Sequence, residues 1–522
     1  MIELESLTQV VERENLCCTG LLISAILLCK AYLDKYRPVL HGIPTVGHSG
    51  RLTSFISASK LIGDGRQLFR KGYAMNPTGL FKIASFDRFE YVIAGGELVE
   101  DVKRAGDHEI SFHEETVERM RFDYTIKSNI EHSLYHLKVV RTKMTSFNPL
   151  CDDLAEECTL SLKELVEGTN GEWLNIPLWD TVINLIGRTS SRVLVGLPLC
   201  RDREYLDLCI GFSRSIMNYG AIINMIPWPL RPLIGPWLSG YEEHRRLALK
   251  HLGPVVEERL KMQEEYGNDW EGKPEDLVTW LMDEATGEDA TVQNLAMRVL
   301  FINFAAMHNT SMLLSSVLLD LAARPEYVET LREEAREISE SEGWTKGAVA
   351  KMYKIDSFIR ESARFSALAS VSSIRKVCDP NGFKLSNGIT LPYGTSLSII
   401  TEPVHHDPAM YDNPSEFNGS RFYELGKEEL GRGDGAEYHV KHALASVTPT
   451  WLLWGVGKHA CPGRFLAAHE IKVVIAQILL YYDIALVDGR RPDNNWVMHF
   501  CIPDRTARLL IRKKDSKRNA KS

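Results

Sequence analysis

Cys-x-x-Cys pairs are missing from this chain, and their absence excludes the commonest cysteine frameworks. Ten cysteines are scattered over 522 residues, and no two of them have that spacing. Small disulfide-rich domains and zinc fingers depend on regular, close cysteine spacing. Reduced thiols in a protein that faces the cytosol are therefore the simpler interpretation.

An excess of positive charge is missing as well. The chain has 61 Lys and Arg against 69 Asp and Glu, which gives a formal net charge of -8. Because a phosphate backbone is bound mainly by clustered Lys and Arg, we do not expect a nucleic-acid partner. No internal repeat or long low-complexity block occurs, and 44% hydrophobic residues are enough for a large core. A globular enzyme fits these totals.

Long apolar runs are rare, and the best candidate for a membrane span is residues 16–33. This run is just long enough to cross a bilayer if Lys30 reaches the interface. Acidic residues precede it and Lys35 and Arg37 follow it, so the positive-inside rule places the remaining chain in the cytosol. A cleaved secretory signal is the alternative, but the preceding region is acidic and no small-x-small site follows. We expect an anchor in residues 1–36, a catalytic domain in 37–511 and a basic, solvated tail in 512–522.

We expect two other apolar segments to have structures other than a membrane span. Residues 293–323 are interrupted by polar side chains, so we expect a long helix through the protein core. Residues 222–238 combine proline with tryptophan, which is typical of a loop at a membrane interface; a loop that covers the core is the alternative. Helical periodicity from about 115 to 350 and a strand pattern in 382–400 predict a mainly α, α+β fold.

The strongest chemical signal is a glycine-rich loop that presents a thiol just before an apolar helix. Residues 454–464 have the sequence WGVGKHACPGR, and a helical stretch follows in 465–481. The helix dipole and its free amide groups favour a thiolate at Cys461. A thiolate in such a place can ligate heme iron. Taken alone, a cysteine in a glycine-rich loop is more often structural.

This loop resembles the cysteine signature of cytochromes P-450, aromatic-x-x-Gly-x-basic-x-Cys-x-Gly. The matching residues are Trp454, Gly457, His459, Cys461 and Gly463. Tryptophan stands where the family usually has phenylalanine, and histidine where it usually has arginine. The resemblance implies heme b with Cys461 as the axial ligand of the iron. It also implies the P-450 fold, a helix-rich body with a small β-rich lobe.

Two further motifs precede Cys461 in the family's order. Glu361 and Arg364 resemble the Glu-x-x-Arg helix, and Arg421 belongs to a segment, 413–422, like the one that completes a buried structural triad. Residues three apart share one helix face, so Glu361 and Arg364 can pair.

The resemblance also implies cationic partners for the heme propionates. Arg375 and His459 match the family positions for this role. Arg141 is a third candidate, although Leu137 stands where the family pattern has tryptophan. An ordinary arginine on a helix surface is the alternative for Arg141.

The segment that would face bound O2, here called the oxygen side, departs from the family pattern Ala-Gly-x-acid-Thr. Residues 305–309 have the sequence AAMHN, so His308 replaces the acid and Asn309 the threonine, with Thr310 beside them. Our hypothesis is that Asn309 is the donor on the oxygen side and that His308 contributes to proton supply. Alternatively, Thr310 or a substrate hydroxyl is the donor, and Asn309 only satisfies a helix groove.

The function implied by the resemblance is a monooxygenase at the endoplasmic reticulum membrane, with its catalytic domain in the cytosol. It would insert one atom of O2 into a C–H or C=C bond of a lipophilic substrate, with a terpenoid or another fungal secondary metabolite as the leading candidates. NADPH-cytochrome P-450 reductase would supply electrons. A basic face for that partner could contain Lys138, Lys143, Lys458, Arg464 and Lys472, unless these are scattered solvated charges. A heme-thiolate isomerase or dehydratase without a reductase is the first alternative, and a non-catalytic heme protein the second.

Overall fold

The computed structural model describes residues 40, 42–50, 52–147, 149–169, 171–226, 228–430 and 441–514. The predicted anchor in residues 1–36 lies outside the described residues, as does most of the predicted basic tail. Within the described ranges, no helix is long and apolar enough to cross a membrane. The chain divides into two compact units, residues 40–111 with 375–398 and residues 112–374 with 399–514.

The smaller unit is built around a sheet with the strand order β1-β2-β3-β9-β6-β4. Its strands are β1 (Thr45–Val46), β2 (Leu80–Ala84), β3 (Phe89–Ile93), β4 (Ile110–Ser111), β6 (Val371–Val377) and β9 (Ser396–Ile400). The helices α2 (Ser54–Met75) and α3 (Gly96–Arg104) and the pair β7 (Phe383–Lys384) and β8 (Thr390–Leu391) complete it. Helix α2 packs closely on β2, because a Cβ atom at Gly72 would lie 2.2 Å from the Phe81 ring. The chain passes between the units within β6 and β9.

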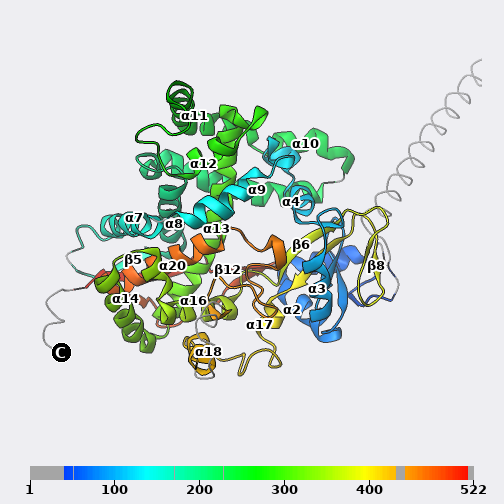
Figure 1. Cartoon of the computed structure of the whole chain (residues 1–522). Coiled ribbons are helices and arrows are strands. Elements are labelled where there is room, and N and C mark those ends of the chain that lie inside the picture. Colours follow the sequence, from blue (N-terminus) through cyan, green and yellow to red (C-terminus); the bar gives the residue numbers. More distant parts are fainter. Residues whose placement is uncertain are drawn as a thin grey trace, which may run out of the picture. The chain divides into compact units, whose positions relative to one another are not determined.

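The larger unit is mainly helical (Figure 1). Its first helices are α4 (Phe112–Met120), α5 (Phe122–Thr125), α6 (Tyr135–Val139), α7 (Leu150–Leu165), α8 (Leu178–Leu194), α9 (Arg203–Met225), α10 (Arg231–Leu238), α11 (Tyr241–Tyr266) and α12 (Leu277–Glu284). The later helices are α13 (Val292–Ala322), α14 (Val328–Glu342), α15 (Lys346–Ala350), α16 (Tyr353–Ser366), α17 (Glu402–His405), α18 (Arg421–Leu430) and α20 (Arg464–Tyr481). Small sheets are formed by β5 (Leu174–Pro177), β10 (Tyr482–Leu486) and β13 (Arg508–Lys513), and by β11 (Asn495–Val497) and β12 (Phe500–Ile502).

Helix α13 confirms the expectation of a long core helix in residues 293–323. Its N-cap is Thr291, whose hydroxyl oxygen accepts the amide N–H of Asn294. The helix is buried along most of its length and packs against α8, α11 and α16. It therefore forms the centre of the larger unit.

Candidate active site

The Cys461 loop depends on two glycines in the left-handed region. Gly455 has φ +78° and Gly457 has φ +64°, values that side chains rarely tolerate. A Cβ atom at Gly455 would also lie 3.0 Å from Ser373 Oγ. The amide N–H of Cys461 donates to the carbonyl oxygen of Trp454 at 2.8 Å, so the loop closes on itself. This closure holds the cysteine at the start of α20.

Burial and the surrounding polar groups shift the pKa of the Cys461 thiol in opposite directions. Burial raises the pKa of the thiol, whereas the backbone N–H groups of Gly463 and Arg464 and the Arg464 charge lower it. Burial is the largest effect, so the pKa is raised overall, contrary to the expectation that the helix start alone would favour a thiolate. A bound metal ion supplies the positive charge that deprotonates such a thiol.

The donor chemistry of this loop fits a heme. In the described part of the chain, no group of three or more His, Cys, Asp or Glu residues could hold a metal ion. Cys461 is half-buried and receives N–H groups on its sulfur. A single cysteine suits an iron that already has four ligands from its own macrocycle. Cys461 would hold the iron, and cationic side chains would hold the propionates.

The predicted propionate donors are placed differently. Arg141 lies in the π-helical turn Val140–Met144, and its Nη2 donates to the carbonyl oxygen of Lys458 at 2.9 Å, so it contacts the Cys461 loop. His459 lies in the same loop and is half-buried. Arg375 belongs to the smaller unit, where burial lowers its pKa to about 10. The roles of all three toward a propionate stay predictions.

The three members of the predicted triad lie together in the core. Arg364 donates to both carboxylate oxygens of Glu361 at 2.8 Å, and Arg421 donates to the same carboxylate at 3.1 and 3.2 Å. Arg364 also donates to the carbonyl oxygens of His405 and Pro414. The buried Glu361–Arg364 pair thus connects α16 with the later segment that contains His405, Pro414 and Arg421.

The residues predicted for the oxygen side are divided between two faces of α13. Ala305 and Asn309, one turn apart, are exposed, and Phe301 is half-exposed in the same row. The hydroxyl of Thr310 donates to the Ala306 carbonyl oxygen at 2.7 Å, within its own helix. Asn309 is therefore the polar group of the open row, and its catalytic role stays a prediction.

His308 lies on another face of α13. Its ring stacks on Trp179 of α8, with centroids 6.2 Å apart. Burial lowers its pKa to about 4, so the imidazole is neutral near pH 7. Its Nε2 has no hydrogen-bond partner among the described residues. Its predicted part in proton supply stays a prediction.

Sequence reasoning misjudged one residue and missed a connection. Lys472 was expected on a basic surface, but it is 5% exposed and pairs with Asp356. Asp356 and Leu444, which are linked to the Cys461 loop through hydrogen bonds, were not predicted as site residues. The signal that could have found Lys472 is its position in an almost wholly apolar helix, where a lone charge needs a partner.

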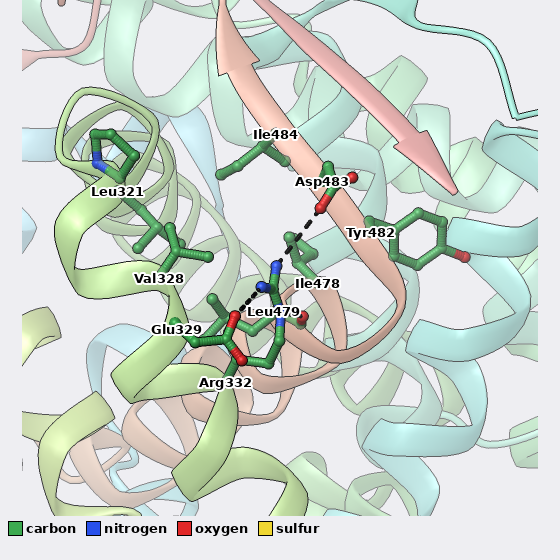
Figure 2. A pocket seen from close by; sticks show the side chains of 10 residues that line it. Leu321, Val328, Glu329, Arg332, Ile478, Leu479, Tyr482, Asp483 and Ile484 are labelled. Carbon is green, nitrogen blue, oxygen red and sulfur yellow. Dashed lines mark hydrogen bonds and ion pairs between the residues drawn. The ribbon is translucent and has the colours of Figure 1, made fainter. Parts of the chain in front are cut away.

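A surface cleft of about 260 Å³ lies between α14 and β10 (Figure 2). The guanidinium group of Arg332 lies in it and contacts Glu329 at 2.6 Å and Asp483 at 3.5 Å. The lining contains no residue of the Cys461 loop or of the open row on α13. This cleft is therefore not a candidate for the substrate site.

Comparison with known proteins identifies the family. The family model for cytochrome P-450 matches residues 125–511. The chain is 34% identical to cytochrome P-450 monooxygenase 103 of Postia placenta, over 95% of this chain and 98% of the relative. It is 32% identical to monooxygenase 151 of the same fungus, over 95% and 97%. An ent-kaurene oxidase of Gibberella intermedia is 29% identical, over 90% and 88%. The chain belongs to the cytochrome P-450 family, like these fungal relatives, and is a heme-thiolate monooxygenase.

Proposed function

We propose that this monooxygenase oxidises a lipophilic terpenoid or a related fungal secondary metabolite. The observation that carries the proposal is the open row of α13, where Phe301 and Ala305 are apolar and Asn309 adds a single amide. Such a surface suits a hydrophobic molecule that needs few polar contacts. The name of the ent-kaurene oxidase relative, which refers to a diterpene, supports this substrate class.

The bound heme would supply the activation of O2 and the redox chemistry. The protein contributes the Cys461 ligand, whose sulfur is oriented by the amide groups of Gly463 and Arg464. The small side chain of Ala305 would leave room for O2, and the Asn309 amide would donate a hydrogen bond to it or order a water molecule that carries a proton. Oriented donors of this kind act only if they are held in place before the reaction.

The electrons would come from NADPH through cytochrome P-450 reductase. Lys143 and Lys458 are exposed. Lys458 belongs to the Cys461 loop, and Lys143 lies two residues after Arg141, whose Nη2 donates to the Lys458 carbonyl oxygen. Lys138 pairs with Glu284 at 2.6 Å and contributes less net charge. An acidic reductase surface would be attracted to such a face, and the rate of electron transfer should then fall as salt increases.

The test is product formation in membranes that contain the chain and a reductase. Extracted fungal metabolites are incubated with NADPH and isotopically labelled O2, and the products are analysed by mass spectrometry. We expect a terpenoid product that carries one labelled oxygen atom and that forms only when NADPH is present. A product that forms without NADPH and without label would favour the isomerase or dehydratase alternative. Labelled products only from unrelated compound classes would overturn the substrate proposal. The Cys461→Ser variant is the negative control.

The location that we propose is the endoplasmic reticulum membrane, with residues 16–33 as a single-pass anchor and the catalytic domain in the cytosol. A second contact is provided by the region of α10, where Leu233 is 76% and Trp237 is 83% exposed, with Trp228 and Leu230 also exposed. Exposed tryptophan and leucine on a short helix are typical of an element that rests at a bilayer interface.

A further inference from the structure

A buried ion pair connects α20 with α16. Lys472 Nζ lies 2.5 Å from Asp356 Oδ1, and both side chains are 7% exposed. Charges at such depth persist only when they are paired and hydrogen-bonded. Both residues lie in the larger unit, and Lys472 is on the helix that begins at Arg464, three residues after Cys461.

The second oxygen of Asp356 holds the backbone of Leu444. Asp356 Oδ2 accepts the amide N–H of Leu444 at 2.6 Å. The carbonyl oxygen of Leu444 accepts two indole N–H groups, from Trp451 at 3.0 Å and from Trp454 at 2.6 Å. Both acceptor positions of this carbonyl oxygen are thus used. Leu444 is completely buried, so water does not compete for these groups.

Trp454 carries the connection to the ligand. Its indole is bound to Leu444, and its own carbonyl oxygen accepts the amide N–H of Cys461. A phenylalanine, the usual residue in the family signature, has no N–H for the bond to Leu444. Trp451 is held separately, because its ring stacks on His405 with centroids 5.2 Å apart.

We propose that Asp356 and Lys472 are positioning residues for the cysteine ligand. Through Leu444 and Trp454 they hold the loop that positions the Cys461 sulfur, which would ligate the iron. Both side chains are buried and lie outside the Cys461 loop, so they would act on it only through other residues. Without these bonds, the amide N–H of Cys461 and the Trp454 carbonyl oxygen would no longer be held at a fixed place in the loop.

The first test uses two double variants of the heme-loaded full chain. Asp356→Leu with Lys472→Met removes both charges and the acceptor for Leu444, whereas Asp356→Asn with Lys472→Met keeps a side-chain oxygen for it. Neither leaves a buried charge unpaired, so both should fold. The readout is the fraction of the reduced carbon-monoxide complex that shows the red-shifted Soret band of thiolate ligation. We expect a several-fold larger loss of this band for the Leu variant, with the Asn variant close to the parent.

The control is a second buried ion pair, between Arg259 and Asp276, which connects α11 with α12. Arg259 contacts both carboxylate oxygens of Asp276, which also accepts the amide N–H of Thr279. The double variant Asp276→Leu with Arg259→Met should lower the unfolding temperature and keep the red-shifted band. An equal loss of the band in this control, or an unchanged band in the Asp356→Leu variant, would reduce our pair to a stabilising role and overturn the proposal.

The second test asks whether the effect passes through Trp454. Trp454→Phe keeps an aromatic ring and removes the indole N–H, and Trp451→Phe removes the other N–H from the same carbonyl oxygen. We expect Trp454→Phe to weaken the band much more than Trp451→Phe. Substitutions that break the same series of hydrogen bonds do not have additive effects. Adding Asp356→Leu and Lys472→Met to Trp454→Phe should therefore cause little further loss of the band. Full additivity would show that the pair does not act through Trp454.

Discussion

The Cys461 sulfur needs a positive partner, because burial outweighs the amide groups that favour its ionised form. We expect Cys461→Ser to lose the red-shifted Soret band of the reduced carbon-monoxide complex completely, since a serine alkoxide is far too basic to replace a thiolate near neutral pH. Absorption spectra of the reduced protein measure this directly. Cys501→Ser is a matched control, because Cys501 is buried in another part of the larger unit. A band that persists in Cys461→Ser would mean that another cysteine is the ligand.

Asn309 and Thr310 are neighbours with different surroundings, and this difference yields a prediction. The Thr310 hydroxyl is bonded within its helix, whereas Asn309 lies in the open row. Asn309→Ala should retain substrate binding and form roughly tenfold less product per NADPH, the equivalent of one hydrogen bond of about 1.4 kcal/mol. Reduced oxygen would then leave as hydrogen peroxide, which is measured together with NADPH consumption.

Two further variants separate the alternatives. Asn309→Thr should recover much of the product yield, because a hydroxyl can donate where the amide did. Thr310→Ala should change the yield little. The opposite result, with full yield in Asn309→Ala and a collapse in Thr310→Ala, would assign the donor to Thr310.

The junction between helix α16 and the chain that follows it depends on one carboxylate, that of Glu361. Glu361 is completely buried and is bound by Arg364 and Arg421. Arg364→Met leaves part of this charge without a partner and should reduce the free energy of unfolding by about 3–5 kcal/mol. Urea denaturation measures the loss. Arg246→Met, which removes an exposed pair with Glu243, should change the stability little.

The contact between α20 and α8 contains a carboxyl group that titrates near neutral pH. Burial raises the pKa of Glu470 to about 7, against hydrogen bonds from Thr189 and Ser190, and Cys158 is the ionisable group beside it. The folded protein therefore binds this proton more tightly than the unfolded chain. The stability from Glu470 is complete below its unfolded pKa and is lost as pH rises toward and through about 7.

The corresponding variant is Glu470→Gln, which has no charge at any pH. Its unfolding temperature should exceed that of the parent increasingly from pH 5.5 to pH 8, because only the parent must bury a carboxylate there. Thermal denaturation across this range measures the difference. A difference that does not depend on pH would show that the pKa of Glu470 is the same in the folded and the unfolded protein, and would contradict the raised value.

At the scale of the whole molecule, two membrane contacts are proposed. Deleting residues 1–33 should release heme-loaded protein from membranes at least in part, because the main anchor is lost and the core is retained. The remaining attachment should fall when Leu233→Ser and Trp237→Ser are added, since these side chains are among the most exposed apolar groups described. Flotation of the proteins with lipid vesicles measures both steps. Complete resistance of the deletion to salt and alkaline extraction would contradict a single anchor.

Features that depend on a short stretch of sequence could be predicted, whereas features that depend on contacts between distant parts of the chain could not. The Cys461 loop, the Glu361 pair and the long helix α13 could be predicted because each is specified by a short stretch of chain. The depth of Lys472 could not, because a lysine's exposure is decided by the helices that pack on it. The raised pKa of the Cys461 thiol was missed for the same reason, since desolvation depends on the complete fold.

Because α13 has one exposed and one packed face, related enzymes could change their substrate without a change of fold. Residues 301, 305 and 309 form the open row, whereas His308 is fixed against Trp179, whose ring also lies beneath the Arg505 guanidinium at 4.9 Å. Phe301 packs edge-on against Phe122 and His136, whereas residues 305 and 309 are exposed. A replacement at residue 305 or 309 therefore removes few packing contacts, so the helix keeps its place while the surface offered to a ligand changes. Gene duplication followed by drift at these two positions would thus yield paralogues with new substrates and an unaltered scaffold.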